Sequence, residues 1–403
     1  MSELSDIIQR EEMRQANTIN LVASENYASI NVRNAVASCF TNKYAEGYPG
    51  RRYYGGCEIA DELETYCQKK WQEVFQTDYC VNVQPHSGSS ANLAVYAALL
   101  KPGDKILSMS LPDGGHLSHG STVSLSGKLY QVYNYGLDQQ ERINYDTLEL
   151  LICNIRPKLI IAGASAYSRI IDFAKIRNII ERDRTAYRSV YKEDYEPIFM
   201  ADIAHIAGLV AAELHPTPFG YADVVTTTTH KTLRGTRGGL IFCKPEYEKR
   251  INSAVFPGLQ GGPLLHVIAG KAATAEEACT EEFKQYMRQV VANCKAMSDA
   301  FLRMGYRVVS GGTDNHLLLL DLTGTGLTGK DVQERLEQFN IEVNKNCIPN
   351  DPLPAKLTSG IRIGSAAMTT RGLIEDDFIF IAEKIDKIIK DLQKERDANA
   401  ASS

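Results

Sequence analysis

Several features of secreted, metal-binding and membrane proteins are missing from this chain of 403 residues. Its nine cysteines include no CxxC pair, which disfavours a metal site, and their odd number is typical of reduced thiols. The N-terminal stretch from Met1 to Asp6 has no apolar core, so we expect no signal peptide. No apolar run approaches the roughly 20 residues that span a bilayer. We therefore expect a cytoplasmic protein without a metal and without a membrane partner.

An excess of positive charge is also missing. The formal net charge is −5, which argues against a general nucleic-acid or anionic-membrane binder but leaves room for a local cationic pocket. Hydrophobic residues make up 44% of the chain and charged residues 23%, as in ordinary globular proteins. A chain of 403 residues exceeds the size at which a single core usually stops growing, so two domains are expected.

The order of the expected elements indicates an α/β fold. Helical patterns alternate with short apolar runs over residues 58–280, which is typical of a mainly parallel, doubly wound sheet. The expected helices are Glu58–Phe75, Ser89–Leu100 and Phe173–Arg182, and the expected strands are Lys105–Met109, Leu159–Ala162, Ile198–Ala201, Val224–Thr227 and Leu240–Cys243.

The two ends of the chain have other patterns. Residues 3–20 predict a polar amphipathic helix, and one long helix is expected over Leu264–Ala300. Strands and helices then alternate in a smaller α/β domain. We therefore divide the chain into residues 1–57 (an arm and a loop), 58–280 (a large domain) and 281–403 (a small domain).

Lys231 is the most informative residue of the sequence. It ends the β-branched run that starts at Val224, and a basic, glycine-rich turn follows it. Open α/β sheets bind ligands at the carboxyl ends of their strands, and a partly desolvated lysine there can attack a carbonyl to form a Schiff base. A surface lysine in a strand-to-loop turn is the alternative interpretation.

Asp202 follows the apolar run Ile198–Ala201 and should also lie at the carboxyl end of a strand. If the two strands are neighbours, Asp202 and Lys231 face the same crevice. A carboxylate there would keep the nitrogen of a pyridine-type cofactor protonated, which makes the ring an electron sink. Capping of the next helix is the alternative role for Asp202.

Two short motifs would complete such a site. Ser87, Gly88 and Ser89 precede a helical run, where small residues and the helix N-terminus suit a phosphate. His116 follows the strand at 105–109 and could stack on a flat ring. Taken separately, the first motif is also explained by serine capping and the second by a solvated loop histidine.

Two further features point to a substrate. Arg362 lies inside a short apolar strand, where a charge needs a partner, either a substrate carboxylate or an internal Asp or Glu. The loop from Tyr44 to Gly56 places four tyrosines beside Glu46, which favours a binding loop over a plain turn. Together the motifs suggest an aldehyde cofactor with a phosphate, and an amino-acid substrate.

In this order, the motifs resemble those of the serine hydroxymethyltransferases. The resemblance rests on Leu21–Tyr27, Asn42–Gly56, Gln84–Ser89, Gly114–Gly120, Asp202–Gly208, Thr226–Thr232, Ser253–Pro263, Ser310–His316 and Ser359–Gly364. It implies an aspartate-aminotransferase-like large domain with a mainly parallel sheet, an N-terminal helical arm and a smaller C-terminal α/β domain. It also implies reversible transfer of the serine hydroxymethyl group to tetrahydrofolate, giving glycine and 5,10-methylenetetrahydrofolate, with pyridoxal 5'-phosphate as cofactor.

The resemblance also implies roles for single residues. The expected catalytic residues are Lys231, Glu46, His230, Tyr54 and Tyr44. The cofactor would contact Ser87, Gly88, Ser89, His116, Ser165, Asp202, His205, Lys231 and Gly262. The substrate site would contain Ser24, Arg362 and Arg237, and the folate site Leu111, Gly115, Leu117, Tyr53, Asn346 and Phe256. Tyr44, Tyr54 and Gly262 would reach in from a second subunit, so a homodimer with shared active sites is implied.

Two other functions stay open at the level of the sequence. A pyridoxal-phosphate aldolase acting on threonine-like β-hydroxy amino acids would use the same lysine and aspartate without folate. A non-catalytic scaffold or RNA-binding relative would need neither. The chain also departs from the family pattern in several places, of which two matter most here. Residues 185–196 form an insertion expected to be a surface lobe or a subunit contact, and Ser365 begins a Ser-Ala-Ala sequence where Thr-Pro-Ala is common.

Overall fold

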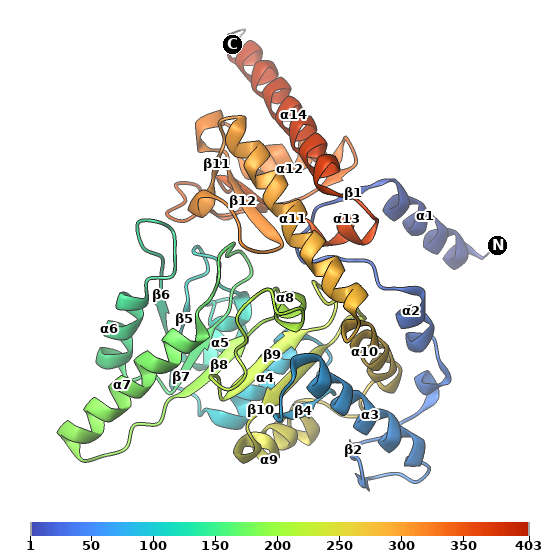
Figure 1. Ribbon diagram of the computed structural model, residues 1–403, viewed down its shortest axis with the longest axis vertical. Coiled ribbons are helices and arrows are strands. Elements are labelled where there is room, and N and C mark those ends of the chain that lie inside the picture. The colour runs from blue at the N-terminus through green and yellow to red at the C-terminus, as the bar shows by residue number, and fades with distance from the viewer. Residues whose placement is uncertain (1, 402–403) are drawn as a thin grey trace. The chain divides into compact units, whose positions relative to one another are not determined.

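The computed structural model describes residues 2–401, which form two compact units (Figure 1). The large unit is Asn26–Met287, and the small unit joins the chain up to Glu25 to the chain from Arg288 onward. The first 25 residues therefore belong with the C-terminal part, although they lie far from it in sequence. The predicted domain boundaries after residues 57 and 280 stay a prediction.

A seven-stranded sheet forms the centre of the large unit, in the order β4-β10-β9-β8-β7-β5-β6 (Figure 1). The contiguous strands from β9 to β6 pair in parallel, and β10 is antiparallel to both of its neighbours. The strands are β4 (Cys80–Asn82), β5 (Lys105–Met109), β6 (Gln131–Tyr135), β7 (Leu159–Ala162), β8 (Ile198–Asp202), β9 (Val224–Thr228) and β10 (Gly239–Cys243). The mixed α/β fold with a mainly parallel sheet is confirmed.

Helices surround this sheet because their apolar faces need cover. In α4 (Gly88–Leu99), Ala91, Val95 and Leu99 are buried in one cluster with strand residues such as Ile106 and Met200. The other helices are α2 (Ile30–Val36), α3 (Glu58–Phe75), α5 (Leu125–Leu129), α6 (Tyr145–Ile155), α7 (Phe173–Tyr191), α8 (Ala207–Ala211), α9 (Pro245–Ser253) and α10 (Leu265–Ala278). Single turns of other helix types are η1 (Cys39–Asn42), η2 (Leu117–His119) and η3 (Ala254–Leu259), and a small hairpin pairs β2 (Gly47–Tyr48) with β3 (Arg51–Arg52).

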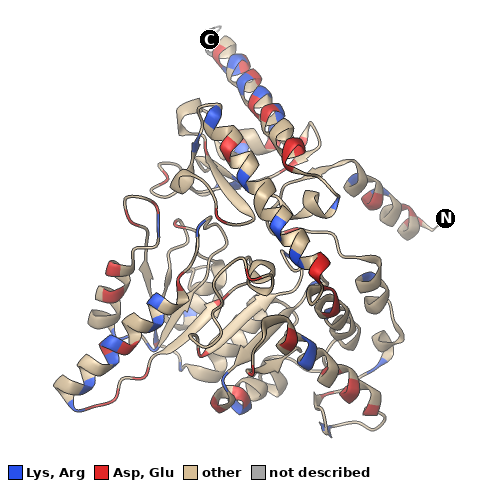
Figure 2. Cartoon of the chain, in the orientation of Figure 1, with Lys and Arg blue, Asp and Glu red and all other residues tan. Residues whose placement is uncertain are grey.

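Three predictions about the helices differ from the structure. The helix expected over residues 3–20 ends at Asn17, because Ile19–Asn20 form β1. The single helix expected over 264–300 is two helices, α10 and α11 (Glu281–Arg303), because the Thr280 hydroxyl accepts a hydrogen bond from Phe283 N and caps the second one. The helix expected to end at Arg182 continues to Tyr191, so the first half of the insertion is helical. Figure 2 shows basic and acidic residues mixed along α7. Arg177 and Arg184 both pair with Glu181 there.

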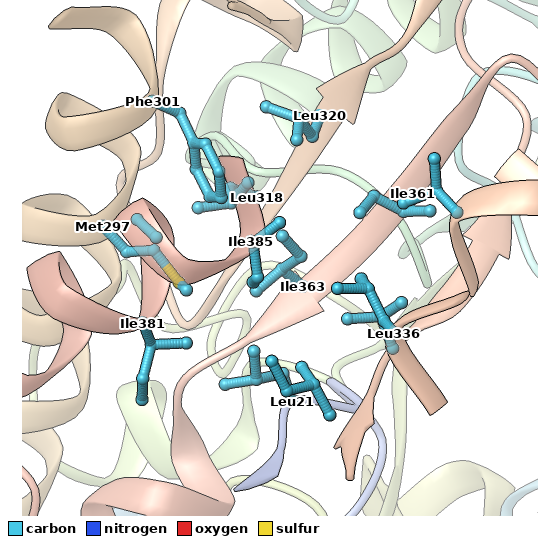
Figure 3. Close-up of a cluster of buried hydrophobic side chains, with 14 of the residues drawn as sticks. Leu21, Met297, Phe301, Leu318, Leu320, Leu336, Ile361, Ile363, Ile381 and Ile385 are labelled. Atoms are coloured by element: carbon cyan, nitrogen blue, oxygen red, sulfur yellow. The ribbon is translucent and has the colours of Figure 1, made fainter. Parts of the chain in front are cut away.

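The small unit is built on a four-stranded antiparallel sheet in the order β11-β12-β15-β14. Leu21, Phe301, Leu318, Ile363 and Ile385 meet in its buried core (Figure 3). The strands are β11 (Arg307–Val308), β12 (Leu317–Asp321), β14 (Asn344–Asn346) and β15 (Gly360–Gly364), and β1 (Ile19–Asn20) pairs in parallel with β13 (Ile341–Glu342). The helical elements are α1 (Glu3–Asn17), η4 (Val309–Gly311), η5 (Thr323–Thr325), α12 (Gly329–Glu337), α13 (Ala366–Thr370) and α14 (Glu375–Ala401).

The described residues hold no helix that is both long and apolar enough to cross a membrane. Between residues 2 and 401 there is also no cluster of three or more histidine, cysteine or carboxylate side chains suited to a metal ion.

Candidate active site

Asp202 is a buried carboxylate at the carboxyl end of β8. Its Oδ2 accepts hydrogen bonds from His119 Nε2 at 2.8 Å and from Asn92 Nδ2 at 2.9 Å, and its Oδ1 accepts one from Ala204 N at 3.0 Å. Burial acts to raise the pKa of Asp202, but the His119 contact, assisted by His116 and Asn92, outweighs it and holds the pKa well below its usual range. The carboxylate is therefore ionised at neutral pH although only 9% of the residue is exposed.

Lys231 lies in the loop that follows β9, the strand next to β8. In the parallel register Asp202 pairs with Thr226, so both loops leave the same edge of the sheet. The backbone of the two loops is tied together, because the Thr232 hydroxyl donates to His205 O at 3.0 Å and accepts from Gly208 N at 2.9 Å. Lys231 is 9% exposed. The condition that the sequence left open, that the two strands are neighbours, is met.

His230 precedes this lysine and is mostly buried. Burial, followed by the charges of Arg237 and Lys231, lowers the pKa of His230 to about 3. Its Nδ1 is buried and has no hydrogen-bond partner within residues 2–401. The imidazole is therefore neutral at physiological pH and can contact a ring without adding charge.

Ser165 and the loop before His116 form another wall beside Asp202. Ser165 N donates to Gly114 O at 2.7 Å, and a Cβ added at Gly114 would lie 2.7 Å from Ala166 O. Gly163 approaches Asp202 closely as well, since its added Cβ would lie 2.3 Å from Asp202 O. The structure thus brings together the segments that carry Ser165, Asp202 and His116, as the sequence predicts.

The Ser87–Ser89 motif forms the N-terminus of α4. The Ser87 hydroxyl accepts from Ser90 N at 3.2 Å, and the Ser90 hydroxyl accepts from Ser87 N at 2.9 Å, which is a capping box. Serine capping is therefore present, and it leaves the exposed amides at the helix start to face an anion. Gly88 fits tightly there, because a Cβ would lie 2.6 Å from Thr228 Cγ2.

Glu46 lies in a tyrosine cluster. The Tyr54 hydroxyl donates to Glu46 Oε2 at 3.1 Å, and the Tyr44 hydroxyl is 3.5 Å from Glu46 Oε1. The rings of Tyr44 and Tyr54 meet edge to face at 5.5 Å, and a Cβ added at Gly262 would lie 2.9 Å from the Tyr44 ring. Four residues assigned to catalysis or cofactor binding therefore form one group within a single chain.

Arg362 and Ser24 lie in the small unit. Ile361 and Ile363 point into the core (Figure 3), so the alternation along β15 directs Arg362 to the other face, where its Nε donates to Asn344 Oδ1 at 2.9 Å. Burial lowers the pKa of Arg362 to about 10, so the guanidinium stays charged at neutral pH. The segment before Ser24 packs on the end of the same strand, since Gly364 N donates to Leu21 O at 2.7 Å.

Ser365, which begins the Ser-Ala-Ala sequence, is held by hydrogen bonds. Its side chain is buried, and the hydroxyl donates to Val290 O at 2.7 Å, while its amide donates to His316 O at 3.0 Å. These two hydrogen bonds fix the end of the Arg362 strand.

The residues predicted for folate lie on several loops. Leu111 and Leu117 are exposed on either side of buried Gly115, after β5. Tyr53 and Phe256 meet with ring centroids 5.5 Å apart. Asn346 ends β14 of the small unit, and Arg237 is an exposed residue of the loop after Lys231.

Comparison with known proteins identifies the family of this chain. A protein-family model described as serine hydroxymethyltransferase matches residues 1–385. The chain belongs to the serine hydroxymethyltransferase family. It is therefore a transferase that interconverts serine and glycine with tetrahydrofolate, and this family match does not favour the folate-free aldolase.

A curated relative from Coprothermobacter proteolyticus, named serine hydroxymethyltransferase, is similar over nearly the full length. It is 54% identical over 387 residues, which cover 96% of this chain and 90% of the relative. The family resemblance read from the motifs is confirmed.

His119 was not predicted as a site residue, although it makes an ion-pair contact to Asp202 at 2.8 Å. Only its spacing hinted at it, because His119 comes one turn after His116 in the same loop. His116 is itself held by that turn, since its Nδ1 contacts the Ser118 hydroxyl at 2.6 Å and accepts from Ser118 N at 3.1 Å. Asn92 was missed for a different reason, because it lies inside α4 and looks like an ordinary helix residue.

Proposed function

We propose that Asp202, Lys231 and the N-terminus of α4 hold pyridoxal 5'-phosphate. The observation that supports this most is the buried, ionised Asp202 on the strand next to the one that leads to Lys231. Its two oxygens accept three hydrogen bonds, which leaves one acceptor site on Oδ1 for the protonated ring nitrogen. The donors and acceptors present thus fit the cofactor. When bound, it supplies an electron sink for the carbanion that forms at the substrate Cα.

We extend the proposal to the remaining cofactor contacts. Lys231 would hold the cofactor covalently through Nζ, and Ser87, Gly88 and Ser89 would bind its phosphate at the helix start. His116 would stack on the ring, His230 would lie beside it, and Ser165, His205 and Gly262 would complete its surroundings.

Arg362 would bind the amino-acid carboxylate. Its guanidinium is charged and nearly dehydrated, and a planar fork of donors matches a carboxylate in two parallel hydrogen bonds. Ser24 would add a hydroxyl to this carboxylate, and Arg237 would order the substrate from the loop after Lys231. These contacts would fix the orientation of the bond that breaks at Cα.

Glu46 would move the proton during hydroxymethyl transfer. The hydrogen bond to Glu46 raises the pKa of Tyr54, so the phenol stays protonated and donates to the carboxylate. Tyr54 and Tyr44 would thereby orient Glu46 toward the hydroxymethyl oxygen. Leu111, Gly115, Leu117, Tyr53, Asn346 and Phe256 would hold the folate.

We also propose a cytoplasmic homodimer with shared active sites. Because Glu46, Tyr44, Tyr54 and Gly262 form one cluster, whichever subunit supplies one of them to a site supplies all four. Nine free cysteines, four of them buried, support a reducing compartment.

The assignment of Lys231 is tested with the purified protein. The wild type should gain a visible absorption band on titration with pyridoxal 5'-phosphate and should form glycine from serine only with tetrahydrofolate. Lys231→Ala should lose the band and nearly all turnover, whereas Lys394→Ala, on the exposed face of α14, should keep both. Unchanged turnover in the Lys231 variant would refute the assignment.

A further inference from the structure

Lys271 is a buried lysine to which the proposed chemistry gives no role. It lies in α10 and is 1% exposed. Lysine is seldom buried unless it is paired, because its ammonium loses hydration. Its Nζ lies 2.6 Å from Val83 O, 2.9 Å from Pro85 O and 2.9 Å from Gly239 O. Three carbonyls therefore match the three N–H donors of the ammonium.

These carbonyls come from two segments that meet at the phosphate loop. Val83 and Pro85 lie between β4 and Ser87, and Gly239 begins β10. Gly239 N also donates to Pro85 O at 3.1 Å, so that carbonyl is bound from two sides. A Cβ added at Gly239 would lie 2.3 Å from Ser87 O, which shows how closely the strand is pressed against the proposed phosphate site.

Neither a neutral amine nor an apolar side chain could satisfy all three carbonyls as the ammonium of Lys271 does. Burial lowers the pKa of Lys271 to about 8, so the group is mostly charged at neutral pH. A neutral amine has two donors and would turn its lone pair toward one of the three carbonyls, and an apolar side chain would leave all three unsatisfied. Either change would loosen the turn before α4.

The packing around the side chain fixes the ammonium in place. A Cβ added at Gly238 would lie 2.3 Å from Lys271 Cε and 3.1 Å from its Nζ. One turn further along α10, the Thr274 hydroxyl accepts from Thr236 N at 3.4 Å. The helix thus contacts the phosphate loop through Lys271 and the end of the Lys231 loop through Thr274.

We infer that Lys271 is a positioning residue for cofactor binding, which holds the Pro85–Ser89 turn in the conformation that receives the phosphate of pyridoxal 5'-phosphate. The inference rests on the proposed function of this loop. Lys271 acts through the backbone of Val83, Pro85 and Gly239 and does not contact the cofactor itself.

The test compares two ligands, pyridoxal 5'-phosphate and pyridoxal, which lacks the phosphate. Lys271→Met keeps most of the side-chain volume and removes the ammonium. It should weaken binding of pyridoxal 5'-phosphate roughly 10- to 100-fold, as mutation of the residues that support metal ligands weakens metal binding. Binding of pyridoxal, measured by equilibrium dialysis, should stay unchanged. The readout is the affinity for pyridoxal 5'-phosphate divided by the affinity for pyridoxal. General destabilisation of the protein affects both ligands alike and leaves this ratio unchanged.

Two further variants complete the test. Phe173→Leu, in the buried core of the same unit, should lower the unfolding midpoint and leave the affinity ratio at the wild-type value. If Lys271→Met does not fold, Gly238→Ala keeps the lysine but displaces its ammonium, and it should lower the ratio in the same direction.

A wild-type ratio in the Lys271 or Gly238 variant, or an equal loss for both ligands, would overturn the inference. Absence of pyridoxal 5'-phosphate binding by the wild-type protein would instead refute the proposed function itself.

Discussion

At the scale of single residues, His119 decides the charge of the site. Asp202 is buried, and a buried carboxyl group alone would favour its neutral form. The hydrogen bond from His119 Nε2 reverses that preference, and Asn92 adds a second donor. The carboxylate that we propose keeps a cofactor nitrogen protonated thus obtains its ionised state from neighbouring side chains.

This arrangement predicts how stability depends on pH. The pKa of Asp202 is depressed in the folded state, so its contribution is present above the unfolded pKa of about 3.9 and is lost as the pH falls below it. His119→Phe should remove this contribution and cost about 3 to 5 kcal/mol at pH 7, as for other broken buried pairs. Urea unfolding from pH 3 to pH 7 would measure it.

The difference in the free energy of unfolding between the wild type and His119→Phe should become smaller as the pH falls from 7 to 3. His266→Phe, at a half-buried histidine of α10, is the matched control and should run parallel to the wild type. A constant difference for His119→Phe across the series would show that Asp202 is not the group involved.

Tyr54 supplies a second prediction at this scale. Tyr54→Phe removes the hydroxyl that donates to Glu46 and should lower folate-dependent turnover by roughly 100-fold, the lower end of what a positioned proton-transfer group contributes. The unfolding midpoint should not change, because half of this side chain is exposed. Tyr66→Phe removes a similar tyrosine-to-carboxylate hydrogen bond, to Glu276, and should leave turnover intact.

At the scale of elements, the insertion at residues 185–196 lengthens α7, and two of its tyrosines pack against one arginine. Arg156, at the end of α6, pairs with Asp183 and lies over the rings of Tyr187 and Tyr195, 4.7 and 5.3 Å from their centroids. The Tyr195 hydroxyl donates to Pro157 O at 2.7 Å. The insertion therefore folds back on its own unit, and its tyrosines already have a cation to contact.

Arg156→Met should destabilise the protein by about 1 to 3 kcal/mol, since it removes the partner of buried Asp183 and two cation–π contacts. Turnover at saturating substrate should be unchanged, because this contact lies outside the proposed catalytic set. Thermal unfolding and a steady-state assay would check both. Arg182→Met, which breaks only an exposed pair with Glu149, should stay within about 0.5 kcal/mol of the wild type.

At the scale of the whole molecule, the cluster of Glu46, Tyr44, Tyr54 and Gly262 makes the proposed dimer testable by complementation between inactive variants. Lys231→Ala and Glu46→Gln should each be inactive alone. In a mixed dimer, one site would combine Lys231 of one subunit with Glu46 of the other and would be intact. Refolding the two variants together at equal amounts should therefore restore about a quarter of wild-type activity, since half of the random dimers are mixed and each has one intact site.

Restored activity should elute at the size of a dimer in size-exclusion chromatography. If mixed dimers form and stay inactive, Glu46 acts within its own subunit, and the shared-site arrangement is wrong. A mixture of Lys231→Ala with Lys231→Met is the control, because no combination of those subunits contains the lysine.

The sequence by itself determined the α/β class and the family, and it supports the predictions for the site residues. Strands such as Lys105–Met109 and Leu159–Ala162 were predicted with their observed bounds, because a buried parallel strand must be a short apolar run with polar ends. Lys231, Asp202 and Ser87 could be predicted as site residues because a ligand at the end of a strand or at the start of a helix requires particular side chains there.

Only the tertiary structure decided which residues support these groups. His119 reaches Asp202 across 83 positions of sequence, and Lys271 reaches Val83 across 188, so no local pattern marks either contact. Likewise, the sequence does not show that α7 continues to Tyr191. The reason becomes visible only in the structure, where Arg156 contacts the rings of Tyr187 and Tyr195. Local patterns report the period of an element and the groups at its ends, whereas the partner of a buried charge is set by packing between distant segments.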